Sequence, residues 1–167
     1  GKFLPYVLEE LHTVDQFIYN AGYLVNKPFS DLSGTDFDRS INVNVKGAFA
    51  MIKALFPLFN KNSHILTISS MGGFQGSAKF PGLSLYSASK GALAVLTECL
   101  AEEFKDRSIK CNCLALGAVQ TEMLAEAFPG YAAPLAPKEM AEFIADFSLN
   151  GHKYFNGKIL PVSLSTP

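Results

Sequence analysis

Short β-rich runs alternate with longer helical patterns along this sequence, and this alternation limits the possible folds more than any other feature. Mostly apolar runs predict strands at residues 14–19, 64–69, 109–116 and 158–162. Helical patterns lie at residues 5–12, 33–59, 85–105, 121–127 and 137–149. Strands that alternate with helices of this length are typical of a parallel sheet with helices on both faces. The sequence therefore predicts an α/β fold.

The boundaries of the longest elements carry their own signals. Ser33 and Thr35 are alternative N-caps for the helix that we expect to run to about Phe59. Residues 64–69 carry three large aliphatic side chains and no formally charged residue, a pattern near that of strands buried on both faces. A Gly-rich loop, residues 71–83, separates this strand from the next helix. Residues 1–167 are accordingly expected to form a single domain.

Composition narrows the class of protein. Hydrophobic residues make up 49% and charged residues 17%, the net charge is −1, and no long basic or acidic run occurs, so we expect neither nucleic acid nor a membrane as partner. No apolar stretch approaches the ~20 residues that span a bilayer, and the first residues lack a signal-peptide layout. Cys99, Cys111 and Cys113 have no zinc-type spacing, so we expect reduced thiols, no metal, and a cytoplasmic location.

Tyr86 and Lys90 are the residues most suggestive of chemistry. Side chains four positions apart lie on one face of a helix, so the phenol and the ammonium can point into one site. A tyrosine with its ordinary pKa near 10 is a poor acid or base at neutral pH, and a nearby cation is expected to lower that pKa. The spacing alone is weak, because Tyr23–Lys27 and Tyr154–Lys158 repeat it by accident, in a loop and at a turn.

Neighbouring motifs distinguish Tyr86 from these two matches. The strand before it ends at Ser69 and Ser70, where ligands bind in open α/β sheets, and either serine could instead satisfy a backbone group. The earlier strand ends at a turn, residues 20–22. In the long helix Asn42 and Asn44 compete for one role, with a surface amide as the alternative reading.

Together these motifs resemble the short-chain dehydrogenase/reductase family. Its Asn-Asn-Ala-Gly motif is matched by Tyr19-Asn20-Ala21-Gly22, and its helical asparagine by Asn44. Ser70 matches its catalytic serine, and Tyr86 with Lys90 matches its Tyr-x-x-x-Lys pair. The Pro-Gly motif is matched by Leu116-Gly117, followed by Val119 and Thr121. The matches occur in the family's order and cover essentially the whole chain.

The resemblance implies catalytic roles for four residues in an alcohol/carbonyl oxidoreductase that uses NAD or NADP. Tyr86 would exchange a proton with the substrate oxygen while hydride moves to or from the nicotinamide. Lys90 would lower the pKa of Tyr86 and hold the nicotinamide ribose. Ser70 would orient the substrate oxygen, and Asn44 would hold a water that relays protons from Lys90.

The resemblance also implies cofactor contacts outside this set. Asn20, Ala21 and Gly22 would line the adenosine side, and Gly117, Val119 and Thr121 would contact the nicotinamide end. Thr121 could equally be an N-cap for the helix that follows. The substrate would be a small molecule under a lid, residues 123–137, whose aromatic residues and alanines suggest an apolar pocket.

One part of the family pattern has no match. The Gly-rich phosphate turn, Thr-Gly-x-x-x-Gly-x-Gly, should precede Asn20, and nothing there resembles it. The first βαβαβ portion of the doubly wound Rossmann-like sheet would then be missing, roughly 60 residues at ~30 per βαβ unit. We therefore hypothesise that the chain is the C-terminal catalytic part of a longer protein, testable by intact mass. By itself it would bind cofactor poorly and be inactive, with residues 14–19 as an apolar unpaired sheet edge.

Two other functions compete with the enzyme hypothesis. The missing phosphate turn favours a non-catalytic interaction or regulatory relative that binds no cofactor, whereas the Asn44, Ser70, Tyr86 and Lys90 set favours the enzyme. An epimerase or dehydratase of the extended relatives also uses Tyr-x-x-x-Lys, but the region after Thr121 is too short for its substrate domain. Family members usually pair two long helices between subunits, here residues 33–59 and 85–105, which implies a homodimer or homotetramer.

Overall fold

A four-stranded parallel sheet forms the centre of the computed structural model, which describes residues 3–164. The strands follow one another in the sheet in chain order: β1 (Val14–Tyr19), β2 (Phe59–Ser70), β3 (Lys110–Leu116) and β4 (Lys158–Val162). The α-helices are α1 (Phe3–Glu10), α2 (Gly34–Ile41), α3 (Gly47–Leu55), α4 (Ser84–Glu103), α5 (Glu122–Ala127) and α6 (Pro137–Asn150). The predicted α/β class is confirmed.

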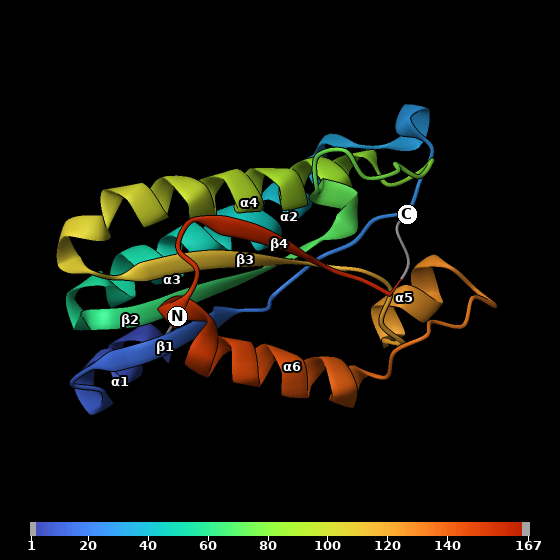
Figure 1. Cartoon of the computed structure of the whole chain (residues 1–167). Helices are drawn as coiled ribbons and strands as arrows, with labels where there is room; N and C mark the ends of the chain where they lie inside the picture. The colour runs from blue at the N-terminus through green and yellow to red at the C-terminus, as the bar shows by residue number, and fades with distance from the viewer. Residues whose placement is uncertain (1–2, 165–167) are drawn as a thin grey trace.

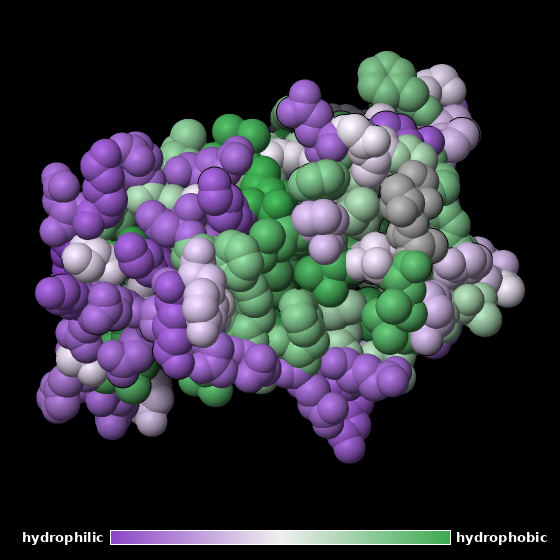
Figure 2. Space-filling view, in the orientation of Figure 1, coloured by the Kyte–Doolittle hydropathy of each residue, from purple (hydrophilic) through white to green (hydrophobic). Residues whose placement is uncertain are grey.

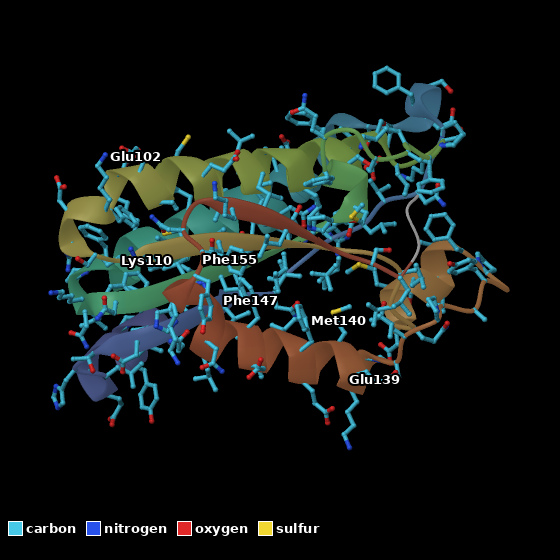
Figure 3. The ribbon with its side chains drawn as sticks, in the orientation of Figure 1. Glu102, Lys110, Glu139, Met140, Phe147 and Phe155 are labelled. Carbon is cyan, nitrogen blue, oxygen red and sulfur yellow. The ribbon has the colours of Figure 1, made fainter. Side chains whose placement is uncertain are left out.

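Helices cover both faces of the sheet, as Figure 1 shows, with α2, α3 and α4 on one side and α6 on the other. Because side chains alternate along a strand, neighbouring residues of β2 enter different layers. Ile65 packs with Ile52 of α3, while Leu66 packs with Phe147 of α6. In Figure 3, Phe147 lies on the side of α6 that faces the sheet. Burial on both faces accounts for the consecutive apolar residues Ile65 and Leu66 in the middle of β2.

The carboxyl ends of the strands meet at one edge of the sheet, on the α5 side of Figure 1. Tyr19 is paired with Thr67, Ser70 with Leu116, and Leu116 in turn with Val162. The segments that leave β1, β2 and β3 therefore start side by side. This is the position at which open parallel sheets bind ligands.

Within residues 3–164, β1 pairs with β2 alone, so one side of β1 is an open sheet edge. Ile18 is 39% exposed there. The predicted unpaired apolar edge is present in the structure. The opposite edge is β4, and Figure 2 shows apolar side chains gathered across the middle of the face formed by β4 and α6.

The predicted helix over residues 33–59 is present as a continuous helical segment from Gly34 to Leu58, but it is not α-helical throughout. The helix begins as expected after Ser33, which accepts a hydrogen bond from the Asp36 amide in a capping box. It then widens into a π-helical turn, Asn42–Lys46, before α3 and a 3-10 turn, Phe56–Leu58. The Tyr19 hydroxyl donates to the Val43 carbonyl within the widened turn, at 2.5 Å. The π-helical turn is therefore held by a side chain from the end of β1.

Strand β2 is longer than predicted because it begins at Phe59 rather than at His64. Its first residues are mostly exposed, with Asn62 at a φ of 71°. The register with β1 is irregular here, since Val14 pairs with Phe59 but Gln16 pairs with His64. The polar start of β2 therefore gives no hydrophobic pattern from which to predict a strand. Further 3-10 turns lie at Phe29–Asp31, Met71–Gly73, Lys105–Arg107 and Gly151–Lys153.

Two further observations concern membrane-spanning helices and metal sites. None of the helices over residues 3–164 is both long and apolar enough to cross a membrane. In the same range, no group of three or more His, Cys, Asp and Glu side chains is placed to hold a metal ion.

Candidate active site

A cleft of about 430 Å³ opens at the carboxyl edge of the sheet. Its walls come from the segments after β1, β2 and β3, from the start of α4, and from α5. Among the predicted site residues, those that line it are Asn20, Gly22, Ser70, Tyr86, Lys90, Gly117, Val119 and Thr121. Ala21 and Asn44 do not line it. Residues predicted from four separate motifs are thus brought to one cavity by the fold.

Tyr86 lies in the first turn of α4, where its partly buried side chain faces the cleft. Burial raises the pKa of its phenol above the ordinary 10.0, and the hydrogen bond with the Ser70 side chain acts in the opposite direction. The predicted lowering of the Tyr86 pKa by Lys90 is not seen, because burial, which disfavours the charged phenolate, is the largest influence. The Lys90 Nζ atom is 5.9 Å from the centre of the Tyr86 ring.

Lys90, one helical turn further on, is only 4% exposed. Its Nζ donates to the Ile68 carbonyl of β2 at 2.8 Å, and burial lowers its pKa to about 8. Gly22 lies directly opposite, since a Cβ at this position would be 3.3 Å from the Lys90 Nζ. The absence of a side chain at Gly22 therefore leaves the ammonium accessible from the cleft.

The two adjacent serines at the end of β2 make different contacts. Ser69 is 3% exposed and its hydroxyl donates to the Lys90 carbonyl at 2.8 Å, so it fixes α4 to the sheet. Ser70 accepts a hydrogen bond from the Gly72 amide at 3.2 Å and also bonds the Tyr86 side chain. Of the two hydroxyls, that of Ser70 is therefore the one placed beside the phenol.

The two asparagines of the π-helical turn are equally distinct. Asn42 is exposed, whereas Asn44 is fully buried. The Asn44 Oδ1 accepts from the Tyr23 amide at 2.7 Å, and its Nδ2 donates to the Tyr23 carbonyl at 2.9 Å and to Ser89 Oγ at 2.7 Å. Since Ser89 precedes Lys90, Asn44 ties the segment after β1 to the turn of α4 that carries Tyr86 and Lys90. The water relay inferred for Asn44 stays a prediction.

The segment after β3 forms another wall of the cleft. The Gly117 amide donates to the Val162 carbonyl at 2.9 Å, which extends the pairing of β3 with β4. Val119 forms an isolated parallel bridge with Leu135. Thr121 is the N-cap of α5, because its hydroxyl accepts from the Leu124 amide at 3.2 Å. The capping alternative for Thr121 is thus correct, and the same residue also lines the cleft.

Sequence reasoning missed Gly73, on which the close approach of the Gly-rich loop to α4 depends. A Cβ at Gly73 would come within 2.5 Å of the Gly91 nitrogen and 2.6 Å of the Lys90 carbonyl carbon. The available signal was the Gly72-Gly73 pair opposite a helix of small residues, which could have predicted this packing. Neither accidental Tyr-x-x-x-Lys match contributes to the cleft.

Comparison with known proteins agrees with this geometry. The family model for short chain dehydrogenases matches residues 2–132. A dehydrogenase/reductase SDR family member 6 from Xenopus laevis is 31% identical over 142 residues, which are 82% of this chain and 55% of that relative.

Two solved structures are also similar. A blue fluorescent protein from a metagenomic library, in complex with NADPH, is 25% identical with a TM-score of 0.83, over 97% of this chain and 68% of that one. A 3-ketoacyl-(acyl-carrier-protein) reductase from Brucella melitensis, complexed with NADH, is 26% identical with a TM-score of 0.83, over 96% and 70%. The family match covers most of the chain, from the segment before β1 to α5. This chain belongs to the short-chain dehydrogenase/reductase family.

Proposed function

We propose that the protein containing this chain is an NAD(P)-dependent oxidoreductase that interconverts an alcohol and a carbonyl, with Tyr86 as the proton donor and acceptor. The observation that carries the proposal is the meeting of Ser70, Tyr86 and Lys90 at one cleft. The hydroxyl of Ser70 already bonds the phenol, so a substrate oxygen placed between the two would contact both.

The raised pKa of Tyr86 favours a role as proton donor at neutral pH. Because burial disfavours the phenolate, the side chain is protonated at neutral pH and can donate its proton to a carbonyl oxygen as that oxygen gains negative charge. Ser70 supplies a second donor where the charge develops. The reverse reaction needs the phenolate to accept a proton from an alcohol. Alcohol oxidation is therefore expected to accelerate as pH rises, while carbonyl reduction does not need alkaline pH.

The residues of the cleft are suited to a nicotinamide dinucleotide. Lys90 has a buried ammonium that faces the bare Cα of Gly22, a combination suited to ribose hydroxyls. Asn20 and Gly22 would hold the adenosine side, while Gly117, Val119 and Thr121 would hold the nicotinamide side. When bound, the cofactor supplies or accepts hydride. The solved relatives named above carry NADPH and NADH, and both cofactors are consistent with these residues.

The chain spans 55% of the length of its Xenopus relative, and its sequence holds no Gly-rich phosphate turn. Such a turn supplies the backbone amides that bind pyrophosphate. We therefore propose that residues 1–167 alone bind the dinucleotide weakly and turn over little.

The test uses the protein at the full length of its relatives. NADH and NADPH are titrated by nicotinamide fluorescence, and reduction of a panel of ketones and aldehydes is followed by loss of cofactor absorbance. We expect saturable binding of one cofactor and cofactor-dependent reduction. Failure to bind either cofactor would instead favour a regulatory relative that keeps the fold without the chemistry.

We also propose that the protein assembles as a homodimer or homotetramer through α3 and α4. Phe49 and Val95 are 50% and 56% exposed on these helices, so each helix offers a large apolar side chain to such an interface. Sedimentation velocity of the full-length protein tests this: Val95→Glu is expected to shift the distribution toward monomer, and an unchanged distribution counts against this interface.

A further inference from the structure

Much of the lining of the cleft is apolar and forms what we call the apolar wall. It is built from three chain segments, residues 20–28, 71–83 and 116–131. Their large apolar side chains at the cleft are Leu24, Met71, Phe80, Leu83, Met123, Leu124 and Tyr131. Apolar lining of this kind favours an apolar ligand because water leaves both surfaces on binding.

Hydrogen bonds join the three segments of this wall to one another. The Lys27 amide donates to the Gly82 carbonyl at 3.1 Å, which joins the first segment to the second. The Asn26 Nδ2 donates to the Ala127 carbonyl at 2.8 Å, which joins the first segment to the end of α5. A ligand therefore meets a wall whose segments are already connected.

The cations of these segments already have partners. Lys27 forms an ion pair with Asp36 at 3.0 Å. Lys79 turns back onto its own loop, where its Nζ donates to the Phe74 carbonyl at 2.7 Å. Lys90, which lines the cleft itself, donates to a main-chain carbonyl and faces the proposed ribose site. Among the residues that the structure describes here, none offers an unengaged cation to an anionic substrate.

The third segment carries charge of the opposite sign. Between residues 116 and 137 the only charged residues are Glu122 and Glu126, and both are exposed on α5. Neither glutamate lines the cleft, so a carboxylate or phosphate bound there would lose water and gain no counterion from this segment. Burying a charge without a partner is costly.

We propose that the substrate is an uncharged ketone or alcohol with an apolar body, and that the cleft discriminates against carboxylates and phosphate esters of similar size. The inference rests on the proposed function, because the reacting oxygen must lie at Ser70 and Tyr86 while the remainder contacts the apolar wall.

A matched pair of ligands tests the substrate class without turnover. Benzylacetone and its para-carboxylate differ only in one charged group, and saturation-transfer NMR on this chain gives their dissociation constants. We expect the neutral ketone to bind at least about a hundredfold more tightly, since the acid leaves an unpaired charge in the cleft. Equal affinities, tighter binding of the acid, or no binding of either compound would overturn the proposal.

Turnover of the same pair by the full-length protein separates this inference from the proposed function. Reduction of both compounds at similar kcat/KM would support the proposed oxidoreductase function and refute the proposed substrate class. A binding preference for the neutral ketone without reduction of any carbonyl would support the preference of the cleft for uncharged ligands and refute the proposed oxidoreductase function.

A charge introduced at the wall gives the reciprocal test. Met123→Lys places a cation at a cleft-lining position that is 38% exposed and so tolerates a long polar side chain. We expect it to raise the affinity of the para-carboxylate relative to benzylacetone by about tenfold, the value of one good ionic contact. Ala125→Lys adds the same charge to an exposed position of α5 outside the cleft and should leave the ratio unchanged. Equal shifts in both variants would contradict the proposal.

Discussion

Removing the Asn44 side chain should destabilise the protein far more than removing the neighbouring Asn42 side chain. Asn44 is fully buried and makes three hydrogen bonds, two of them to the main chain of Tyr23. In Asn44→Ala the Tyr23 amide and carbonyl lose their partner, while Ser89 keeps its bond to the Tyr86 carbonyl. Each buried polar group left unpaired costs about 1–3 kcal/mol.

Because Tyr23 is only partly buried, water recovers part of this loss, and we expect a total of about 3 kcal/mol. For a chain of this size that corresponds to a fall in Tm of roughly 6–12 °C. Urea and thermal unfolding followed by circular dichroism measure it. Asn42→Ala, at an exposed position of the same turn, should change stability by less than about 0.5 kcal/mol. Indistinguishable stabilities of the two variants would refute the tie between the segment after β1 and α4.

Gly73→Ala should destabilise the protein by about 1–3 kcal/mol, because the new methyl group meets the main chain of α4, whereas at Gly34 a Cβ meets nothing within 4 Å and Gly34→Ala should be nearly neutral in urea unfolding. In native protein, iodoacetamide should label the exposed Cys99 alone, as the other two thiols are buried with raised pKa, and urea should expose all three to labelling, which mass spectrometry counts. Burial lowers the pKa of His64 below its ordinary 6.5, so its contribution to stability is complete above that pH and is lost as pH falls below it. Urea midpoints measured from pH 8 to pH 5 should show this loss, and His64→Gln should reduce it.

Local pattern was sufficient for the elements whose limits coincide with turn residues. The strands at residues 14–19 and 158–162 have the predicted bounds, because each apolar run stops at a polar or Gly-containing turn. The order of the motifs was sufficient to predict most of the named residues that line the cleft, since the carboxyl ends of parallel strands meet at one edge, but Ala21 and Asn44 do not line it.

What the sequence could not provide depends on contacts between distant residues. The π-helical turn is associated with the bonds from Tyr19 and to Tyr23, which no local pattern records. The direction of the pKa shift at Tyr86 was predicted wrongly, because spacing reveals the nearby ammonium but not the degree of burial. The same limit applied to Ser69 and Ser70, whose roles differ by their contacts and not by their type.

Tyr86→Phe tests the central claim, that a phenol held beside Ser70 and Lys90 carries the proton in the reaction. The variant keeps the aromatic ring and its packing and removes only the hydroxyl. In the full-length protein we expect kcat for carbonyl reduction to fall by about a hundredfold to ten-thousandfold, with the dissociation constant of the nicotinamide cofactor nearly unchanged. Turnover comparable to that of the unchanged protein would contradict the assignment.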